Sequence, residues 1–170
     1  MFLRTAATML SVFTLLWSGC DKGLEPLNEP SGFSGVIRFK NWPPPDSALE
    51  LRIAAFETYP SDTSSIVRAL FAGNAVVYPP VGKTGFPKFV DSIAYVFSNE
   101  GAIIKVTEYK YVALAWRYGT NFLVDWRPAG VYTTTPGSFD PAPVRVLLHR
   151  ITPDIDIEVD FHNLPPKPWQ

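Results

Sequence analysis

Apolar and polar residues alternate in several short segments of the chain. Apolar side chains occupy every second position in residues 35–40 and 93–97, and a period of two places one side of a β-strand on a core and the other in water. The longest run, residues 103–118, has apolar residues on both faces over its second half, which predicts a central strand. Further strands are predicted over residues 131–134, 144–148 and 154–161.

Two segments admit more than one interpretation. Leu49, Leu51 and Ile53 alternate with charged residues in segment 46–56, which favours a strand with Glu50 and Arg52 facing water. Ser47 and Glu50 also have the spacing of a capping box, so a helix stays open. Segment 64–72 also has two interpretations. Residues 64–71 form either a short helix that ends at Gly73-Asn74 or the start of a strand that continues through residues 76–78.

Turn residues and composition point to a single all-β domain. The chain has 170 residues, 17 of them proline and 11 glycine, and these separate segments rich in β-branched and aromatic residues. An apolar content of 46% is enough for a packed core. We therefore expect one antiparallel β-sandwich over residues 34–164, followed by a proline-rich tail at 165–170. The net charge of −1 excludes a nucleic-acid-binding protein, which needs a concentrated basic face.

The amino terminus has the features of an export signal. Arg4 precedes an apolar run over residues 6–17, which is too short to span a bilayer. Ser18 and Gly19 then precede Cys20, the only cysteine. This arrangement resembles the bacterial lipobox, although Trp17 stands where that pattern prefers leucine. The resemblance implies a signal peptide over residues 1–19, lipidation of Cys20 and a tether over residues 20–33; an ordinary secretory signal or an uncut anchor is the alternative.

Two sets of motifs resemble known families. Ser34-Gly35-Val36-Ile37 and the segment from Tyr109 to Ala115, ending at Gly119, are similar to strands of transthyretin-like sandwiches, in particular carboxypeptidase regulatory-like domains. That family usually has glycine where this chain has Thr107. The segments 41–44, 129–132 and 159–166 resemble uncharacterised lipoproteins of Bacteroidetes and Chlorobi-type bacteria. These resemblances imply a transthyretin-like or Ig-like Greek key and an envelope location, and no known activity.

Motifs that suggest chemistry have simpler interpretations. Gly82-Lys83-Thr84 lacks the upstream glycine and the following helix of a phosphate-binding loop, and is interpreted as a turn. His149 and His162 stand in no metal-binding or hydrolase pattern. Carboxylates at alternate positions 154–160 are expected to form a solvated strand face, with a calcium site as the alternative. No catalytic residue, metal ligand or cofactor is assigned.

Aromatic residues are the candidates for ligand contact. Trp116 and Tyr111 are expected in the core, since large rings bury much apolar area. Trp42, beside Pro43, and Trp126, in a predicted loop, are candidates for an exposed platform. Hydrogen bonds to sugar hydroxyls are then expected from three neighbours of Trp126: Asn121, Asp125 and Arg127.

The sequence thus predicts a lipid-anchored protein without enzymatic activity. Its membrane contact is the lipid on Cys20, and it is expected at the outer membrane rather than the inner one, as an accessory or interaction module for an unknown envelope protein. The alternative is a carbohydrate-binding surface lipoprotein that uses its exposed aromatic residues.

Overall fold

The computed structural model describes residues 29–122 and 124–168. The predicted signal peptide, Cys20 and most of the predicted tether lie outside these residues. Within them, ten strands, one α-helix and one 3-10 helix confirm the expected all-β class. Among the described helices, none combines the length and the apolar character needed to cross a membrane.

The first sheet is built around strand β1. This strand, Gly32–Lys40, pairs antiparallel with β4, Ser92–Ser98. Its other edge pairs in parallel with β9, Ile151–Thr152, and with β10, Ile157–Asp160. These parallel pairs depart from the expected antiparallel pattern, because the last part of the chain runs along β1 in the same direction.

The second sheet is antiparallel throughout and has the order β3-β2-β6-β7. Its strands are β2, Glu50–Phe56; β3, Ala75–Tyr78; β6, Tyr111–Arg117; and β7, Trp126–Val131. Strand β6 lies between two neighbours, which confirms a central strand in the second half of the predicted run 103–118; the first half of that run contributes only β5, Glu108–Tyr109, which pairs elsewhere. A small ribbon of β5, Glu108–Tyr109, and β8, Val144–Arg145, lies beside it.

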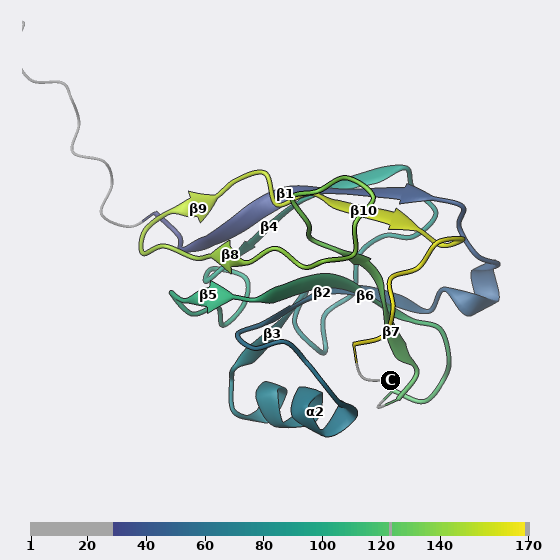
Figure 1. Ribbon diagram of the computed structural model, residues 1–170, viewed down its shortest axis with the longest axis horizontal. Coiled ribbons are helices and arrows are strands. Elements are labelled where there is room, and N and C mark those ends of the chain that lie inside the picture. Colours follow the sequence, from purple (N-terminus) through teal and green to yellow (C-terminus); the bar gives the residue numbers. More distant parts are fainter. Residues whose placement is uncertain (1–28, 123, 169–170) are drawn as a thin grey trace, which may run out of the picture.

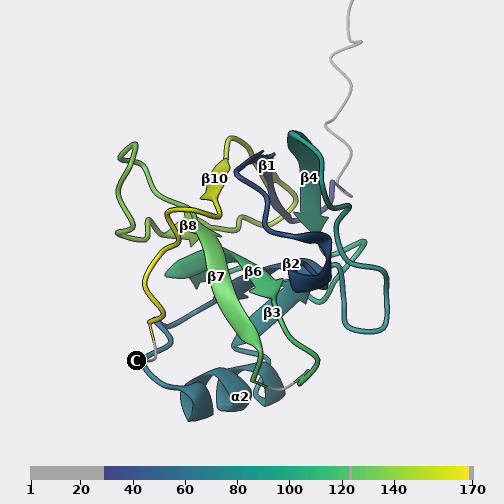
Figure 2. The ribbon, with the colours of Figure 1, turned by 90° about the vertical axis from the view of Figure 1, so that its right-hand side faces the viewer.

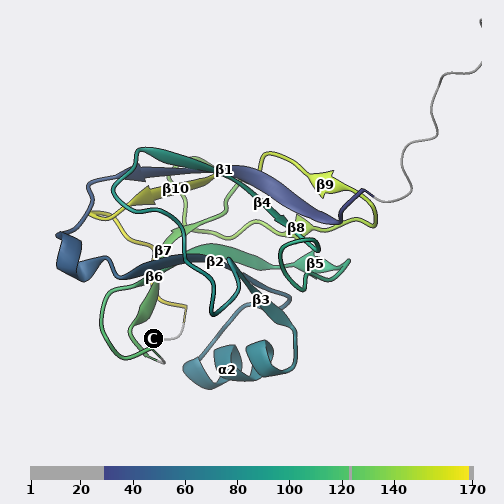
Figure 3. The same cartoon turned by 180° about the vertical axis from the view of Figure 1, so that it is seen from behind.

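The two sheets form two layers around one core (Figures 1 and 3). Leu51, Ile53 and Leu114 of the second sheet are fully buried together with Ile37 and Ile157 of the first. The layers approach closely at Gly130, where a Cβ atom would lie 2.4 Å from the carbonyl oxygen of Glu158. Only glycine permits this contact between β7 and β10.

The structure also decides the two open segments. Residues 50–56 form β2, preceded by the 3-10 helix Pro45–Ser47, so the favoured strand is confirmed. Helix α2, Thr63–Phe71, is followed by β3, so residues 64–78 contain a helix and then a strand. Its capping box is formed by Asp62 and Ser65: the Asp62 carboxylate accepts a hydrogen bond of 2.7 Å from the Ser65 amide.

Several predicted strand boundaries are wrong. Strand β7 starts at Trp126 and ends at Val131, upstream of the predicted strand 131–134, because its residues pair with those of β6. The segment 154–161 contributes only Ile157–Asp160 to β10. Asp154 has a φ of 62°, which interrupts the extended backbone before that strand.

Candidate functional site

An apolar groove lies on the outer face of the second sheet, beneath helix α2. This helix is on the side of the sheet that faces away from the core (Figure 2). The groove has a volume of about 940 Å³. Its floor consists of small residues of adjacent strands, Ala54, Ala113 and Ala115.

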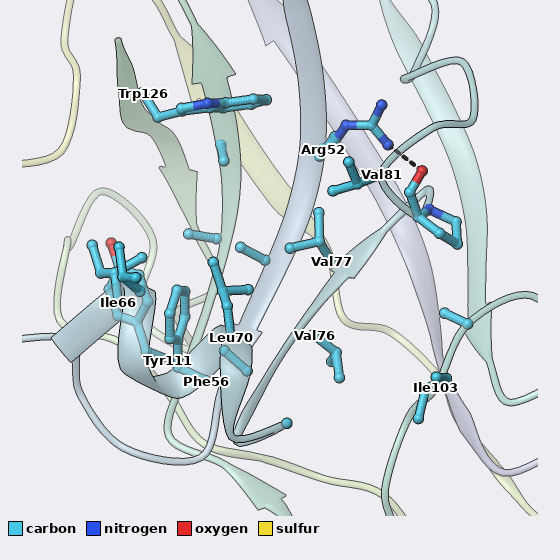
Figure 4. A pocket seen from close by; sticks show the side chains of 18 of the residues that line it. Arg52, Phe56, Ile66, Leu70, Val76, Val77, Val81, Ile103, Tyr111 and Trp126 are labelled. Carbon is cyan, nitrogen blue, oxygen red and sulfur yellow. Dashed lines mark hydrogen bonds between the residues drawn. The ribbon is translucent and has the colours of Figure 1, made fainter. Parts of the chain in front are cut away.

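Three apolar walls surround this floor. Helix α2 contributes Ile66, Val67 and Leu70 on one side. The loops at Val81 and Ile103 form the opposite side, and Trp126 lies at the end away from Tyr111 (Figure 4). Phe122 and Val124 also line the groove. Several wall residues are exposed, with Ile103 at 88% and Val81 at 65%.

The groove exists because α2 covers only part of the sheet. The helix has nine residues, about 13 Å at the usual rise of ~1.5 Å per residue. Its residues Ile66 and Ala69 pack on a small cluster that includes Phe56 and Tyr111. Ala54 and Ala113 are buried in this cluster, whereas Ala115, two residues further along β6, is only partly buried.

Arg52 is buried beside the groove and is fully engaged by the protein. Its side chain forms an ion pair with Glu50 and donates to the carbonyl oxygens of Pro79, Pro80 at 2.8 Å and Lys83 at 2.6 Å; one of these hydrogen bonds is dashed in Figure 4. Glu50 also accepts from Arg117 at 3.1 Å. Arg52 therefore fixes the turn that carries Val81.

The sequence interpretation of Arg52 as a solvent-facing residue is wrong. Its exposed fraction is 4%, because the turn over residues 79–83 covers the outer face of β2. This turn contains Gly82 and Lys83, the first two residues of the segment that the sequence predicted as a turn. The Lys83 amide closes it by donating a hydrogen bond of 3.0 Å to the Pro80 carbonyl.

Tyr111 lines the groove, but its hydroxyl is buried. Its side chain is 3% exposed, and its Oη has no hydrogen-bond partner among the described residues. The ring contacts Tyr59 edge-on, with ring centroids 5.3 Å apart. Burial raises the pKa of Tyr111, so the hydroxyl keeps its proton and is a donor without an acceptor.

Lys105 lies at the rim of the groove and also has internal partners. Its Nζ donates to Glu57 at 3.0 Å and to Asn74 at 3.1 Å. The two cations that line the groove, Arg52 and Lys105, are thus each paired with a carboxylate of the chain.

The structure separates the two tryptophans predicted as a platform. Trp126 lines the groove, is half-buried and donates from Nε1 to the Phe122 carbonyl at 2.7 Å. Trp42 stacks on Phe39, with centroids 4.7 Å apart, and donates to the Val90 carbonyl at 3.0 Å. Trp42 therefore packs on the core side, whereas Trp126 faces the groove.

The three polar candidates, Asn121, Asp125 and Arg127, do not all lie together. Asp125 accepts a hydrogen bond of 2.8 Å from the Asn121 amide, in the turn before β7. Arg127 pairs across the strands with Trp116, a core residue, so it points to the opposite face from Trp126. Its Nη2 donates to the Pro165 carbonyl at 3.3 Å, and its buried Nε has no partner among the described residues.

The carboxylates near β10 take part in surface ion pairs. Arg38 lies 2.8 Å from Asp156 and 3.4 Å from Glu158. Asp160 accepts from the Asn41 side chain at 2.8 Å. In the residues that the structure describes, no cluster of three metal-ligating side chains is found.

Fold and groove together define an all-β protein with an apolar groove on one sheet. Comparisons of the chain with protein-family models, with curated proteins and with solved structures give no match.

Proposed function

We propose that this protein is a non-catalytic binding module of the cell envelope, anchored by a lipid on Cys20, and that the groove is its binding surface. The observation that carries the proposal is the exposed apolar rim of the groove, including Ile103, Val81 and, at 56%, Val124. Contiguous exposed apolar surface marks interaction sites in soluble proteins. A protein tethered near a membrane is well placed to present such a surface.

The chemistry of the lining favours binding over catalysis. A general acid or base must reach the substrate with a free titratable group. Lys105 is occupied by Glu57, and burial holds the Tyr111 hydroxyl in its protonated form. The carboxylate Glu100 also lines the groove, where it is exposed to solvent, and the rest of the lining is mainly apolar.

We also propose that the two sheets form a sandwich of the transthyretin-like or Ig-like type. The single core between the sheets supports this, while the parallel pairing of β1 with β10 is a departure from a purely antiparallel arrangement.

The anchor is tested in the native host or a bacterial expression host with an alkyne analogue of palmitate. We expect the full-length chain to incorporate the label and to fractionate with the outer membrane, and Cys20→Ala to lose both. An unlabelled wild-type chain rules out the anchor.

The binding surface is tested by in-cell photo-crosslinking. The photoreactive residue p-benzoylphenylalanine is introduced at Ile103, on the rim, or at Val96, a matched exposed apolar position on β4. We expect ultraviolet light to give discrete adducts at position 103 that are absent at position 96. The same pattern at both positions contradicts the assignment of the groove.

Carbohydrate binding has weaker support, because Trp42 and Trp126 do not share a surface. Of these two residues, Trp126 lines the groove and Trp42 does not. Binding on a glycan array that disappears in Trp126→Ala would establish carbohydrate binding in place of the apolar ligand.

A further inference from the structure

We infer that the groove binds the alkyl chain of a monoacyl amphiphile, such as a free fatty acid. This inference rests on the proposed function and specifies its ligand. Two features of the groove carry it: its shape with its apolar lining, and the pairing of both cations that line it.

The size and lining of the groove suit one long chain. A volume of about 940 Å³ lies at the upper end of the usual range for small-molecule sites, ~300–1,000 Å³. The alanine floor is flanked by Leu70 on one side and Val81 on the other. A methylene chain makes favourable contact along such a channel and carries no polar atom that would lose its hydration.

The charges of the groove favour an uncharged segment in its interior. Arg52 is neutralised by Glu50 and three carbonyl oxygens, and Lys105 by Glu57. A charged peptide or nucleotide would find no free counter-ion at either position, and the remaining charged residue of the lining, Glu100, is exposed to solvent. The backbone groups of the floor strands β2 and β6 are paired within the sheet, so an extended peptide would also lack main-chain partners.

The test uses dansyl-undecanoic acid as a fluorescent probe and the soluble chain from residue 21 onwards. We expect the dansyl emission to increase and shift to the blue on mixing, and palmitic acid to reverse both changes. Lysophosphatidylcholine carries the same kind of chain on a phospholipid headgroup, and vesicles of phosphatidylcholine supply paired chains. Displacement by palmitic acid and not by the vesicles supports a monoacyl ligand; displacement by the vesicles alone overturns it.

A blocking variant locates the chain. Ala115 is partly exposed on the floor, and Ala115→Phe fills the groove at this position. We expect its affinity for the probe to fall at least about tenfold, the effect of losing about two buried methylene contacts. The matched control, Ala94→Phe, adds the same ring at an exposed position of β4 and leaves the affinity unchanged.

A second variant keeps the test valid if Ala115→Phe fails to fold. Ile103→Ser removes an apolar rim residue that is 88% exposed, so its effect on stability is small, and Val96→Ser is its control. Weaker probe binding in Ile103→Ser alone supports the inference, and equal binding in both variants contradicts it. If the wild type binds no probe while position 103 still crosslinks to a protein, the acyl ligand is wrong and the binding module stands.

Discussion

Tyr111 and Tyr95 form a natural pair for testing how buried hydroxyls contribute to stability. Both side chains are nearly inaccessible, at 3% and 5% exposure. The Tyr95 hydroxyl donates to the Ile155 carbonyl at 2.6 Å, whereas the Tyr111 hydroxyl has no partner among the described residues. We therefore expect Tyr111→Phe and Tyr95→Phe to change the free energy of unfolding in opposite directions.

The magnitudes follow from the hydrogen-bond accounting at each site. A buried polar group without a partner costs ~1–3 kcal/mol, so Tyr111→Phe is expected to raise the free energy of unfolding by about 1 kcal/mol or more. Tyr95→Phe removes a made bond and leaves the Ile155 carbonyl without this donor, which lowers the free energy of unfolding by ~1–2 kcal/mol. For a domain of this size, each kcal/mol shifts the Tm by ~2–4 °C.

The assay is urea unfolding of the chain from residue 21 onwards, which is first extracted to remove bound lipid. Unfolding is followed by tryptophan fluorescence. The test compares the sign of the change in the free energy of unfolding, relative to the wild type, between the two variants. If Tyr111→Phe destabilises the protein as much as Tyr95→Phe does, the Tyr111 hydroxyl has a partner and the reasoning is refuted.

The same pair predicts the response to alkaline pH. Burial raises the pKa of both hydroxyls, so the folded state holds protons that the unfolded state releases above about pH 10. Stability is therefore fully present below about pH 10 and declines above it. Tyr111→Phe removes one of these groups, and we expect its stability to decline less steeply between about pH 10 and 11 than that of the wild type.

Three further predictions concern other sites. Gly130→Ala is expected to lower the free energy of unfolding by ~3 kcal/mol, since its Cβ would overlap the backbone of β10; Gly101→Ala, which would meet only a tyrosine ring at 3.2 Å, costs less in the same urea titration. Arg52→Lys is expected to lose ~3 kcal/mol in urea unfolding, because lysine does not reproduce the forked contacts of a buried guanidinium, and an unchanged midpoint would contradict this. Burial opposes ionisation of Asp156, but the Val36 amide and Arg38 hold the pKa of this carboxyl below its usual value. The ionised carboxyl therefore stabilises the folded state above about pH 4, and this stabilisation is lost as the pH falls further. Asp156→Asn should lower stability at about pH 7 by less than about 1 kcal/mol and leave it unaltered at about pH 2, when urea midpoints are compared at the two pH values.

The alternating pattern predicted the core strands because alternation depends only on which face of a strand each side chain occupies, which is a local property of the sequence. Residues 93–97 and the second half of 103–118 alternate or are apolar throughout, and they form β4 and β6. The parallel position of β10 beside β1 was not predictable in this way. It depends on contacts between residues more than a hundred positions apart, such as Ile37 and Ile157.

The residues around the groove could be predicted only in part, for a related reason. Trp126 was predicted to contact a ligand from a loop, and it lines the groove from a strand, because it pairs with Arg117. Arg52 looked solvent-facing because the turn that covers it lies about thirty residues further along the chain. Its burial becomes visible only when β2 and that turn are placed together.

The groove floor leaves room for the proposed ligand on the outer face of the second sheet. A sheet face that stays in water carries mainly polar side chains, whereas Ala54, Ala113 and Ala115 are all apolar. Ala54 and Ala113 are buried in the cluster on which α2 packs, and Ala115 is partly exposed. Small floor residues between taller apolar walls provide depth for a narrow chain. An alkyl chain fills that depth, and this is why substitution at Ala115 is the most direct test of the site.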